Sequence, residues 1–402
     1  MKKNRFVFSI MLFTFVAALT LSAQPRQQTT VTKHVSDNPS LAIQRFEGSE
    51  SGKEQLLRVL QKCGWFRLLP EAQANKAQIK LQVQYNEPGN NYELQVSPAG
   101  QEDFRCSARH ENLNQASFLA VDMILGKLFN VPAYCSRPIA FVMTGQNNMK
   151  EIYSCYLDGS GQNRITNNAA ISTEPGWGHR NALVYTLARN NALSIVLVDM
   201  QNRRQRLISS TQGLNSSASL SPDGRRVALA LSQDGRVDLY LKDLAKNQSL
   251  RLTNDIYVES SPCWSPDAET LCYVSDRIGK PQLYLLSIRG GQARRLQLGG
   301  NECVSPSWSP VSNKLAYAGK SNSGQYVISV LDMKDKNPMP QTITVAAGDW
   351  EAPSWAPDGR HLVCVRKSGS SRDLYLVDSW LKVFSPISKG AKLALPAWAP
   401  AY

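Results

Sequence analysis

Few side chains in this sequence could carry out acid–base, nucleophilic or metal chemistry. The chain has only four histidines, His34, His110, His179 and His361. No two histidines stand at helical spacing and no Cys-x-x-Cys occurs, so the common zinc patterns are missing. The nucleophile elbow Gly-x-Ser-x-Gly of hydrolases is missing as well. We therefore expect no catalytic residue, no metal site and no cofactor.

A short motif recurs through the C-terminal two-thirds of the chain and predicts the elements that must position any site. Its anchor position is a large apolar residue, most often followed by Ser-Pro or Ala-Pro. The anchors are Trp177, Leu220, Trp264, Trp308, Trp355 and Trp398. They stand 43 to 47 residues apart and include five of the eight tryptophans. Such a period indicates a repeated structural unit.

Each unit predicts four short antiparallel strands. Alternating apolar positions follow most anchors, as at Leu271 and Tyr273, and period two indicates a strand. A glycine turn, a second strand such as residues 282–287 and a brief third strand such as 294–296 come next. With the anchor strand these make four strands in roughly 40–45 residues, which is typical of a propeller blade.

The ends of the repeat region predict six blades closed by the C-terminal strand. Residues 139–142 match the second strand of a unit, but no anchor precedes them. The last anchor, Trp398, has no blade after it. Pairing these two segments completes a ring and removes two sheet edges. We therefore expect an all-β six-bladed β-propeller over residues 136–402.

Residues 24–135 lack the repeat and predict a small α/β domain. Apolar residues at helical spacing favour a helix over 115–129, which Asn112 or Asn114 could cap. A second helix is expected at 50–63. Strands are expected at 41–46, 79–85, 92–96 and 104–107.

The N-terminus has the pattern of a secretory signal peptide. Three basic residues precede an apolar run over residues 6–21, and a small pair ending in Ala23 follows. The alternative is a membrane anchor, but the run is shorter than the ~20 residues that span a bilayer. Gln24 rather than Cys follows, so no lipid anchor is expected. We expect residues 1–23 to be removed by cleavage after Ala23 and the mature protein to be exported.

Export would bring the eight cysteines into an oxidising compartment. Counting across the turn after Trp264 places Cys263 opposite Cys272 on adjacent strands, within disulfide range. The alternative is that Cys263 is simply a small packing residue, because the same column of the repeat otherwise holds Gly, Ser or Ala.

Charge and composition favour a folded globular chain without a nucleic-acid partner. The chain is 42% hydrophobic and 19% charged, with a formal net charge of +13. Its arginine pairs recur at turns or strand ends, which is typical of solvated edges. No basic stripe is interleaved with aromatic residues. His179 and His361 fall in turns after anchors, where we expect them to face solvent.

The segments that lead into the inner strands are the candidate binding surface. In a propeller these loops lie on one face around the central channel, and here they differ in sequence while the anchors repeat. Four of them contain an acid, namely Glu174, Glu259, Glu302 and Glu351. Together these predict negative charge at one mouth and a docking surface for cationic or polar groups. The alternative is that each carboxylate caps a turn or meets a neighbouring arginine.

With these features the chain resembles the TolB family, the periplasmic components of the Tol–Pal envelope system of Gram-negative bacteria. The resemblance rests on the signal peptide, the small α/β domain, the six anchors and the ending Pro-Ala-Trp398-Ala-Pro. It implies a monomeric, non-enzymatic periplasmic adaptor that meets membranes only through its partners. It also implies a contribution to outer-membrane integrity and to cell division.

The resemblance implies two partners. In TolB-like proteins the loops entering the central anchors dock the lipoprotein Pal, which carries that role to Leu214, Ser217 and Ser260 here. Asn301 lies in the next such loop. The N-terminal segment of the family docks TolA, and residues 24–35 depart from the family's hydrophobic strand.

Two other functions remain open at this point. A propeller that binds a small ligand in its channel is compatible with the repeat. A propeller-type peptidase would need the missing nucleophile elbow and room for a hydrolase domain, so the sequence argues against it.

Overall fold

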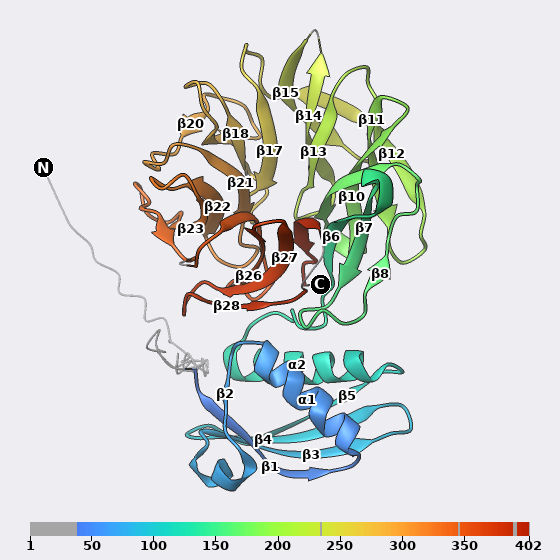
Figure 1. The fold of residues 1–402 in the computed structure, drawn as a ribbon, viewed down its shortest axis with the longest axis vertical. Helices are drawn as coiled ribbons and strands as arrows, with labels where there is room; N and C mark the ends of the chain where they lie inside the picture. Colours follow the sequence, from blue (N-terminus) through green and yellow to red (C-terminus); the bar gives the residue numbers. More distant parts are fainter. Residues whose placement is uncertain (1–37, 234, 345, 389–391, 402) are drawn as a thin grey trace, which may run out of the picture. The chain divides into compact units, whose positions relative to one another are not determined.

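The computed structural model describes residues 38–233, 235–344, 346–388 and 392–401. The expected signal peptide and the segment expected to dock TolA lie outside the described residues. An α/β domain comes first in the described chain, and a β-propeller follows it (Figure 1). No helix in the described ranges has both the length and the apolar character needed to cross a membrane.

The α/β domain is a five-stranded sheet with two helices packed on one face (Figure 1). The strand order is β2-β1-β3-β4-β5, with β1 parallel to β2 and β3 and the other pairs antiparallel. The strands are β1 Ser40–Glu47, β2 Arg67–Leu68, β3 Ile79–Asn86, β4 Asn91–Pro98 and β5 Phe104–Arg109.

Both expected helices are present. Helix α1 (Glu50–Lys62) buries Leu56 and Leu60 against the sheet. Helix α2 (Leu113–Phe129) begins at Asn112, whose side-chain oxygen accepts a hydrogen bond from the Gln115 amide at 3.2 Å, so the expected cap is confirmed. Strand β2 and a 3-10 helix at Glu71–Lys76 were not expected, because such short segments carry no readable period.

Four successive four-stranded antiparallel sheets form the middle of the repeat region. Each starts with an inner strand that ends at an anchor, and each takes its strands in chain order. The strands are β13 Asn215–Leu220, β14 Arg226–Gln233, β15 Arg236–Asp243, β16 Gln248–Arg251; β17 Glu259–Trp264, β18 Thr270–Ser275, β19 Gln282–Ser287, β20 Arg294–Arg295; β21 Cys303–Trp308, β22 Lys314–Lys320, β23 Tyr326–Asp332, β24 Gln341–Thr342; and β25 Asp349–Trp355, β26 His361–Ser368, β27 Ser371–Asp378, β28 Val383–Pro386.

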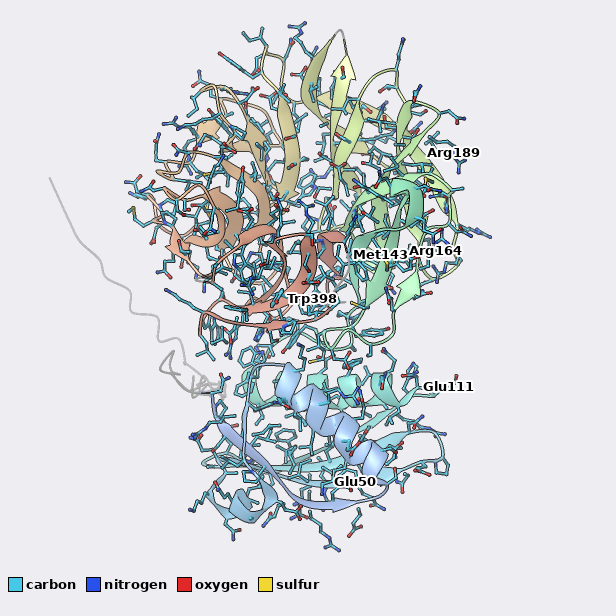
Figure 2. All side chains as sticks on the ribbon, in the orientation of Figure 1. Glu50, Glu111, Met143, Arg164, Arg189 and Trp398 are labelled. Atoms are coloured by element: carbon cyan, nitrogen blue, oxygen red, sulfur yellow. The ribbon has the colours of Figure 1, made fainter. Side chains whose placement is uncertain are left out.

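The remaining strands share one eight-stranded sheet, ordered β12-β11-β10-β9-β7-β6-β29 with β8 paired to β7. Strands β7 and β9 meet at a single residue pair, Lys150 and Ile171. Strand β29 pairs with β6 from Leu393 opposite Met143 to Trp398 opposite Ile139, so Met143 and Trp398 lie at opposite ends of this ladder (Figure 2). The strands are β6 Ile139–Thr144, β7 Lys150–Cys155, β8 Asn163–Arg164, β9 Ile171–Trp177, β10 Ala182–Arg189, β11 Ala192–Asp199, β12 Gln205–Ser209 and β29 Leu393–Trp398.

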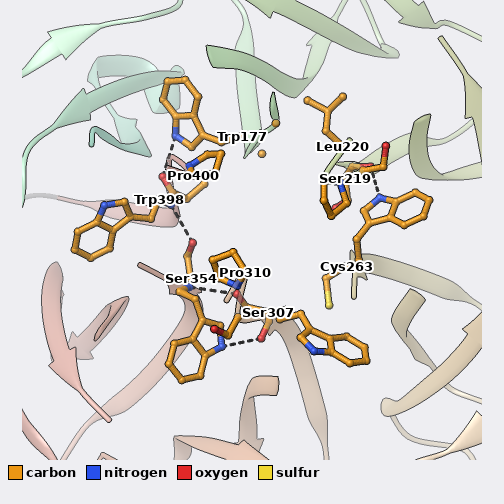
Figure 3. A pocket seen from close by; sticks show the side chains of 18 of the residues that line it. Trp177, Ser219, Leu220, Cys263, Ser307, Pro310, Ser354, Trp398 and Pro400 are labelled. Atoms are coloured by element: carbon orange, nitrogen blue, oxygen red, sulfur yellow. Dashed lines mark hydrogen bonds between the residues drawn. The ribbon is translucent and has the colours of Figure 1, made fainter. Parts of the chain in front are cut away.

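The anchor tryptophans connect neighbouring blades. The indole N–H of Trp264 donates to the Ser219 carbonyl at 3.0 Å, and that of Trp355 donates to the Ser307 carbonyl at 3.0 Å (Figure 3). Each donor lies one blade after its acceptor. At Trp264 and Trp355, burial of the ring and satisfaction of its polar N–H therefore occur together. The buried indole N–H groups of Trp308 and Trp398 have no such acceptor among the described residues.

The Ser-Pro-Asp part of the repeat shapes the turn after the inner strand. The Ser265 hydroxyl donates to Asp267 and accepts from the Thr270 amide at 3.0 Å. The Ser265 amide in turn donates to the Thr270 carbonyl at 2.9 Å. Asp and Ser side chains that bond nearby backbone groups favour turns over continued strand. The motif thus reverses the chain at a fixed distance from the anchor.

Candidate docking rim of the propeller

The expected binding residues lie where the inner strands begin, at one end of the propeller channel. We call this set the docking rim. It consists of Glu174, Leu214, Ser217, Glu259, Ser260, Asn301, Glu302 and Glu351.

A β-bulge gives every inner strand the same shape near this end. The register against the second strand shifts three residues before the anchor, where a residue other than glycine has φ near +50°. These residues are Glu174, Ser217, Ser261, Ser305, Ala352 and Leu395. All six line one cavity of about 180 Å³. Because bulges redirect side chains, the repeated bulge places six residues around a common centre.

Glu174 and Ser217 are brought together by their bulges. One carboxylate oxygen of Glu174 accepts from the Ser217 amide at 2.8 Å and from the Thr186 hydroxyl at 2.7 Å. The other lies 3.3 Å from the Ser217 hydroxyl. This rim carboxylate therefore joins two neighbouring blades.

Glu259 corrects one expectation, because its side chain is buried rather than presented at the mouth. It is 0% exposed and accepts hydrogen bonds from Thr253 and Ser275 at 3.1 Å each, with Arg277 at 3.3 Å. Burial raises the pKa of Glu259, and the nearby Asp255 raises it further against the opposing effect of these donors. Reversing its charge would disturb the core and not only the surface.

Glu302 is a surface acid that is already paired. It lies 2.8 Å from the ammonium of Lys320 and accepts a hydrogen bond from the Tyr326 hydroxyl. These two partners lower the pKa of Glu302, while burial and the adjacent carboxylate raise the pKa of Tyr326 to about 12. Asn301 beside it is exposed, and its side-chain oxygen lies 3.4 Å from the ammonium of Lys280.

The four acids at this mouth, where we expected negative charge to gather, all have partners within the propeller. Glu351 lies 3.5 Å from Arg372, so three of the four rim acids have a cationic partner and the fourth binds backbone and hydroxyl groups. The structure agrees better with the alternative, in which each carboxylate caps a turn or pairs with a neighbouring cation. Leu214, Ser217 and Ser260 are half-buried at the same end.

Three exposed apolar side chains near the rim were missed by the sequence reasoning. Ile256 is 78% exposed, Val258 is 48% exposed and Ile278 is 45% exposed. The loop before β17 carries the first two, and the turn between β18 and β19 carries the third. A hydrogen bond of 2.9 Å from the Val258 amide to Asp276 holds the loop against the turn. The sequence does contain a signal for them, because apolar residues stand at 256 and 258 in a loop whose other residues are mostly polar.

The opposite end of the channel holds a larger cavity of about 450 Å³. Prolines and anchor tryptophans line most of it, together with residues that directly precede an anchor, such as Ser219, Cys263 and Ser307 (Figure 3). His179 lies at its edge and is exposed, as expected. Among the described residues, no group of three or more His, Cys, Asp or Glu is placed to hold a metal ion.

A buried ionic cluster joins the α/β domain to the propeller, and the sequence reasoning missed it. We call Trp65, Asp358, Arg360, His361 and Asp378 the junction cluster. The Arg360 guanidinium is 0% exposed, pairs with Asp378 and lies 4.7 Å from the Trp65 ring centre. Asp358 accepts from the Trp65 indole at 3.0 Å and from the His361 ring at 2.6 Å.

His361 therefore corrects the expectation that it faces solvent, because only 1% of it is exposed. Its two carboxylate neighbours outweigh burial and raise its pKa, and contact with His361 lowers the pKa of both Asp358 and Asp378. The signal was the anchor Trp355-Ala-Pro-Asp, in which Ala356 replaces the usual serine. Without that hydroxyl, Asp358 bonds Trp65 and His361 instead.

Comparison with known proteins supports the same fold. The family model described as the TolB beta propeller domain matches residues 126–402. A crystal structure of TolB from Acinetobacter baumannii matches with a TM-score of 0.81 at 22% identity, covering 91% of this chain and 97% of that one.

Curated relatives agree over shorter segments. The Tol-Pal system protein TolB of Desulfosudis oleivorans is 31% identical over 119 residues, which are 29% of this chain and 27% of that protein. The TolB homolog of Chlorobium luteolum is 31% identical over 28% of this chain and 35% of that protein. The chain thus spans about a third or less of the length of these relatives. Because the family model covers more than half of the chain, including the whole repeat, the chain belongs to the TolB β-propeller family.

Proposed function

We propose that the chain is a non-enzymatic periplasmic adaptor of the Tol–Pal system, which binds the lipoprotein Pal through the docking rim. The family match over residues 126–402 carries this proposal. The Desulfosudis oleivorans relative is named for the Tol-Pal system and not for a reaction, in line with the expectation of no enzymatic activity. The adaptor would support outer-membrane integrity and cell division, and its TolA contact would involve residues 24–35, outside the described residues.

The propeller would have six blades, closed by the C-terminal strand. The pairing of β29 with β6 supports this, as does the single residue pair between β7 and β9. The hydrogen bond of 3.0 Å from the Trp177 indole to the Ala397 carbonyl supports it too, because it repeats the contact between successive anchors. A closed ring would hold the rim loops at fixed spacing, as a rigid scaffold for recognition.

The chemistry of the rim favours a protein partner over a small ligand. Three exposed apolar side chains, Ile256, Val258 and Ile278, lie beside polar and charged groups that are already hydrogen-bonded. Interfaces between proteins commonly have an apolar centre surrounded by a polar edge. The rim acids are internally paired, so the apolar side chains would contribute most of the contact and the charged pairs would orient the partner.

Titration of the purified protein with soluble Pal tests the proposal. Val258→Asp should weaken binding about tenfold or more, since it would leave a carboxylate without a partner among the apolar contacts at the centre of the interface. Ser260→Arg should weaken binding by adding bulk and charge beside it. Neither change should alter the melting temperature much, because Val258 is exposed and Ser260 is half-buried.

Val311→Asp provides the matched control. Val311 is 52% exposed and lies in the turn after β21, at the opposite end of the inner strands. The proposal predicts unchanged Pal affinity for this variant. If V258D and S260R bind Pal as tightly as the wild type does, and only V311D loses binding, the docking surface lies at the opposite end of the inner strands.

A further inference from the structure

One blade differs from the others in carrying thiols on both strands at one register position. Cys263 on β17 lies directly opposite Cys272 on β18. The equivalent pairs elsewhere are Ser219 with Ala228, Ser307 with Ala316, Ser354 with Val363, Gly176 with Val184 and Ala397 with Ala140. Small side chains without sulfur therefore fill this position in the other blades, so packing alone does not require cysteine in either strand.

The geometry of the ladder suits a bond between the two sulfur atoms. Directly opposed residues of an antiparallel pair have Cα atoms about 4.5–5.5 Å apart and side chains on the same face. Disulfides span Cα separations of about 4.4–6.8 Å. Both cysteines belong to the same apolar cluster between β17–β20 and the next blade. In the structure both are free thiols.

The two thiols differ in access. Cys263 is half-buried and lines the cavity of about 450 Å³ at the channel end (Figure 3). Cys272 is fully buried. Burial raises the pKa of Cys272 well above its usual value, with a smaller contribution from the adjacent Cys263. A reagent can therefore reach Cys263 first, and Cys272 is held in position to react second.

We propose that Cys263 and Cys272 form a reversible redox pair, a modification site separate from the docking rim. A disulfide compound or oxidised dithiol protein is the oxidant. The Cys263 thiol gives its proton to solvent, and the resulting thiolate attacks one sulfur of that disulfide, which gives a mixed disulfide and expels the other half as a thiolate. That thiolate takes the proton of Cys272 and becomes the first thiol. The Cys272 thiolate then attacks the Cys263 sulfur and expels the second half, which takes up a proton from solvent and becomes the second thiol. Two protein thiols are oxidised to one disulfide and the oxidant is reduced to two thiols.

The pair would act on the strand that carries part of the docking rim. Strand β17 begins at Glu259 and Ser260 and reaches Cys263 three residues later. A covalent link between β17 and β18 would prevent these strands from separating at the channel end. The inference does not require Pal binding, since it concerns the chemistry of the thiols themselves.

Peptide mapping of the intact purified protein tests the proposal directly. The protein is equilibrated with oxidised and reduced glutathione, quenched with N-ethylmaleimide and digested with trypsin. The sequence has no Lys or Arg between Arg251 and Arg277, so one tryptic peptide, 252–277, contains both cysteines and no other. Oxidation should lower its mass by about 2 Da, the loss of two hydrogens, and remove both alkylation sites. Reduction should restore both sites.

Two variants provide controls. The double variant C263S/C272A copies the Ser219–Ala228 and Ser307–Ala316 pairs, so it should fold and show no response of its melting temperature to glutathione. In the single variant C263S, the buried Cys272 should stay reduced. Cys106 is also half-buried, so all proteins carry Cys106→Ser to prevent links between molecules.

Two results would overturn the proposal. The first is a stable glutathione adduct on Cys263 while Cys272 remains a free thiol. The second is a link between peptides 252–277 and 296–314, because the latter contains Cys303, a buried neighbour in the same cluster. Either result would show that the opposed thiols do not react with each other.

Discussion

The carboxylate of Glu174 accepts a hydrogen bond from the backbone amide of Ser217 at 2.8 Å, across the gap between two blades. The same oxygen accepts from the buried Thr186 hydroxyl at 2.7 Å. One acid thus satisfies polar groups of two sheets. The docking rim is held by such bridges, so its shape depends on side chains that a partner need not touch.

Removing this bridge should destabilise the protein. Glu174→Ala leaves the Ser217 amide and the Thr186 hydroxyl without their acceptor, which typically costs about 1–3 kcal/mol for buried groups. Urea unfolding at neutral pH measures the change in the free energy of unfolding. Glu111→Ala, at an exposed position of the α/β domain (Figure 2), should change it by less than about 0.5 kcal/mol. Equal effects of the two substitutions would contradict the bridging role.

Charge reversal should separate the two kinds of rim acid. Glu259→Lys places an ammonium in a buried site beside Arg277, so we expect a loss of about 3–5 kcal/mol or failure to fold. Glu302→Lys disrupts a surface pair with Lys320, which is typically worth about 0–1 kcal/mol. Thermal melts of both variants check this. Similar melting temperatures would mean that Glu259 is accessible in solution.

The junction cluster should make stability depend on pH in both directions. The pKa of His361 is raised from its ordinary 6.5, so its stabilising contribution is complete below pH 6.5 and is lost as the pH rises through the folded-state pKa. The pKa of Asp358 is lowered from 3.8, so its contribution is present above pH 3.8 and is lost as the pH falls through the folded-state pKa. The cluster therefore contributes most between these limits.

Denaturant unfolding from pH 5 to pH 9 measures the alkaline limit. The free energy of unfolding should decline above pH 6.5 in the wild type, and His361→Gln should flatten that decline while lowering stability at pH 6. His110→Gln is the control, because His110 is exposed. If the free energies of unfolding of H361Q and the wild type decline in parallel above pH 6.5, the titration of His361 does not cause the loss of stability at alkaline pH.

Loss of the last anchor should weaken the propeller strongly. Trp398 is 5% exposed and its ring lies 5.9 Å from that of Tyr134. Trp398→Ala should cost about 3–5 kcal/mol, as for other buried large aromatics. Deleting residues 395–402 also removes the ladder partner of β6, so we expect an insoluble or rapidly degraded protein. A soluble deletion variant with a cooperative melt would contradict the proposed ring closure.

The sequence was sufficient for the repeat, because its signals are local and recur. Anchors, the Ser-Pro-Asp turn and period-two strands lie within one unit, and counting across the turn placed Cys263 opposite Cys272, as the structure has them. The cap of α2 and the four longer strands of the α/β domain followed from the same kind of local pattern.

The site was less predictable, because its contacts join residues far apart in the chain. The burial of Glu259 depends on Ser275 at the end of β18 and on Arg277 in the turn after it. The burial of His361 depends on Asp378 and on the domain that carries Trp65. A single sequence gives the type of these residues and not the identity of their neighbours, so a carboxylate on a loop was expected at the surface.

The pairing of β6 with β29 has a consequence for the order of synthesis. Ile139 is translated long before its ladder partner Trp398, and every other blade is made in between. Until then β6 keeps an unpaired edge of backbone donors and acceptors, which can pair with another chain. Contacts between such distant positions also slow folding. A chain that lacks β29 would therefore be aggregation-prone, so the protein most needs a chaperone during the interval before β29 reaches β6.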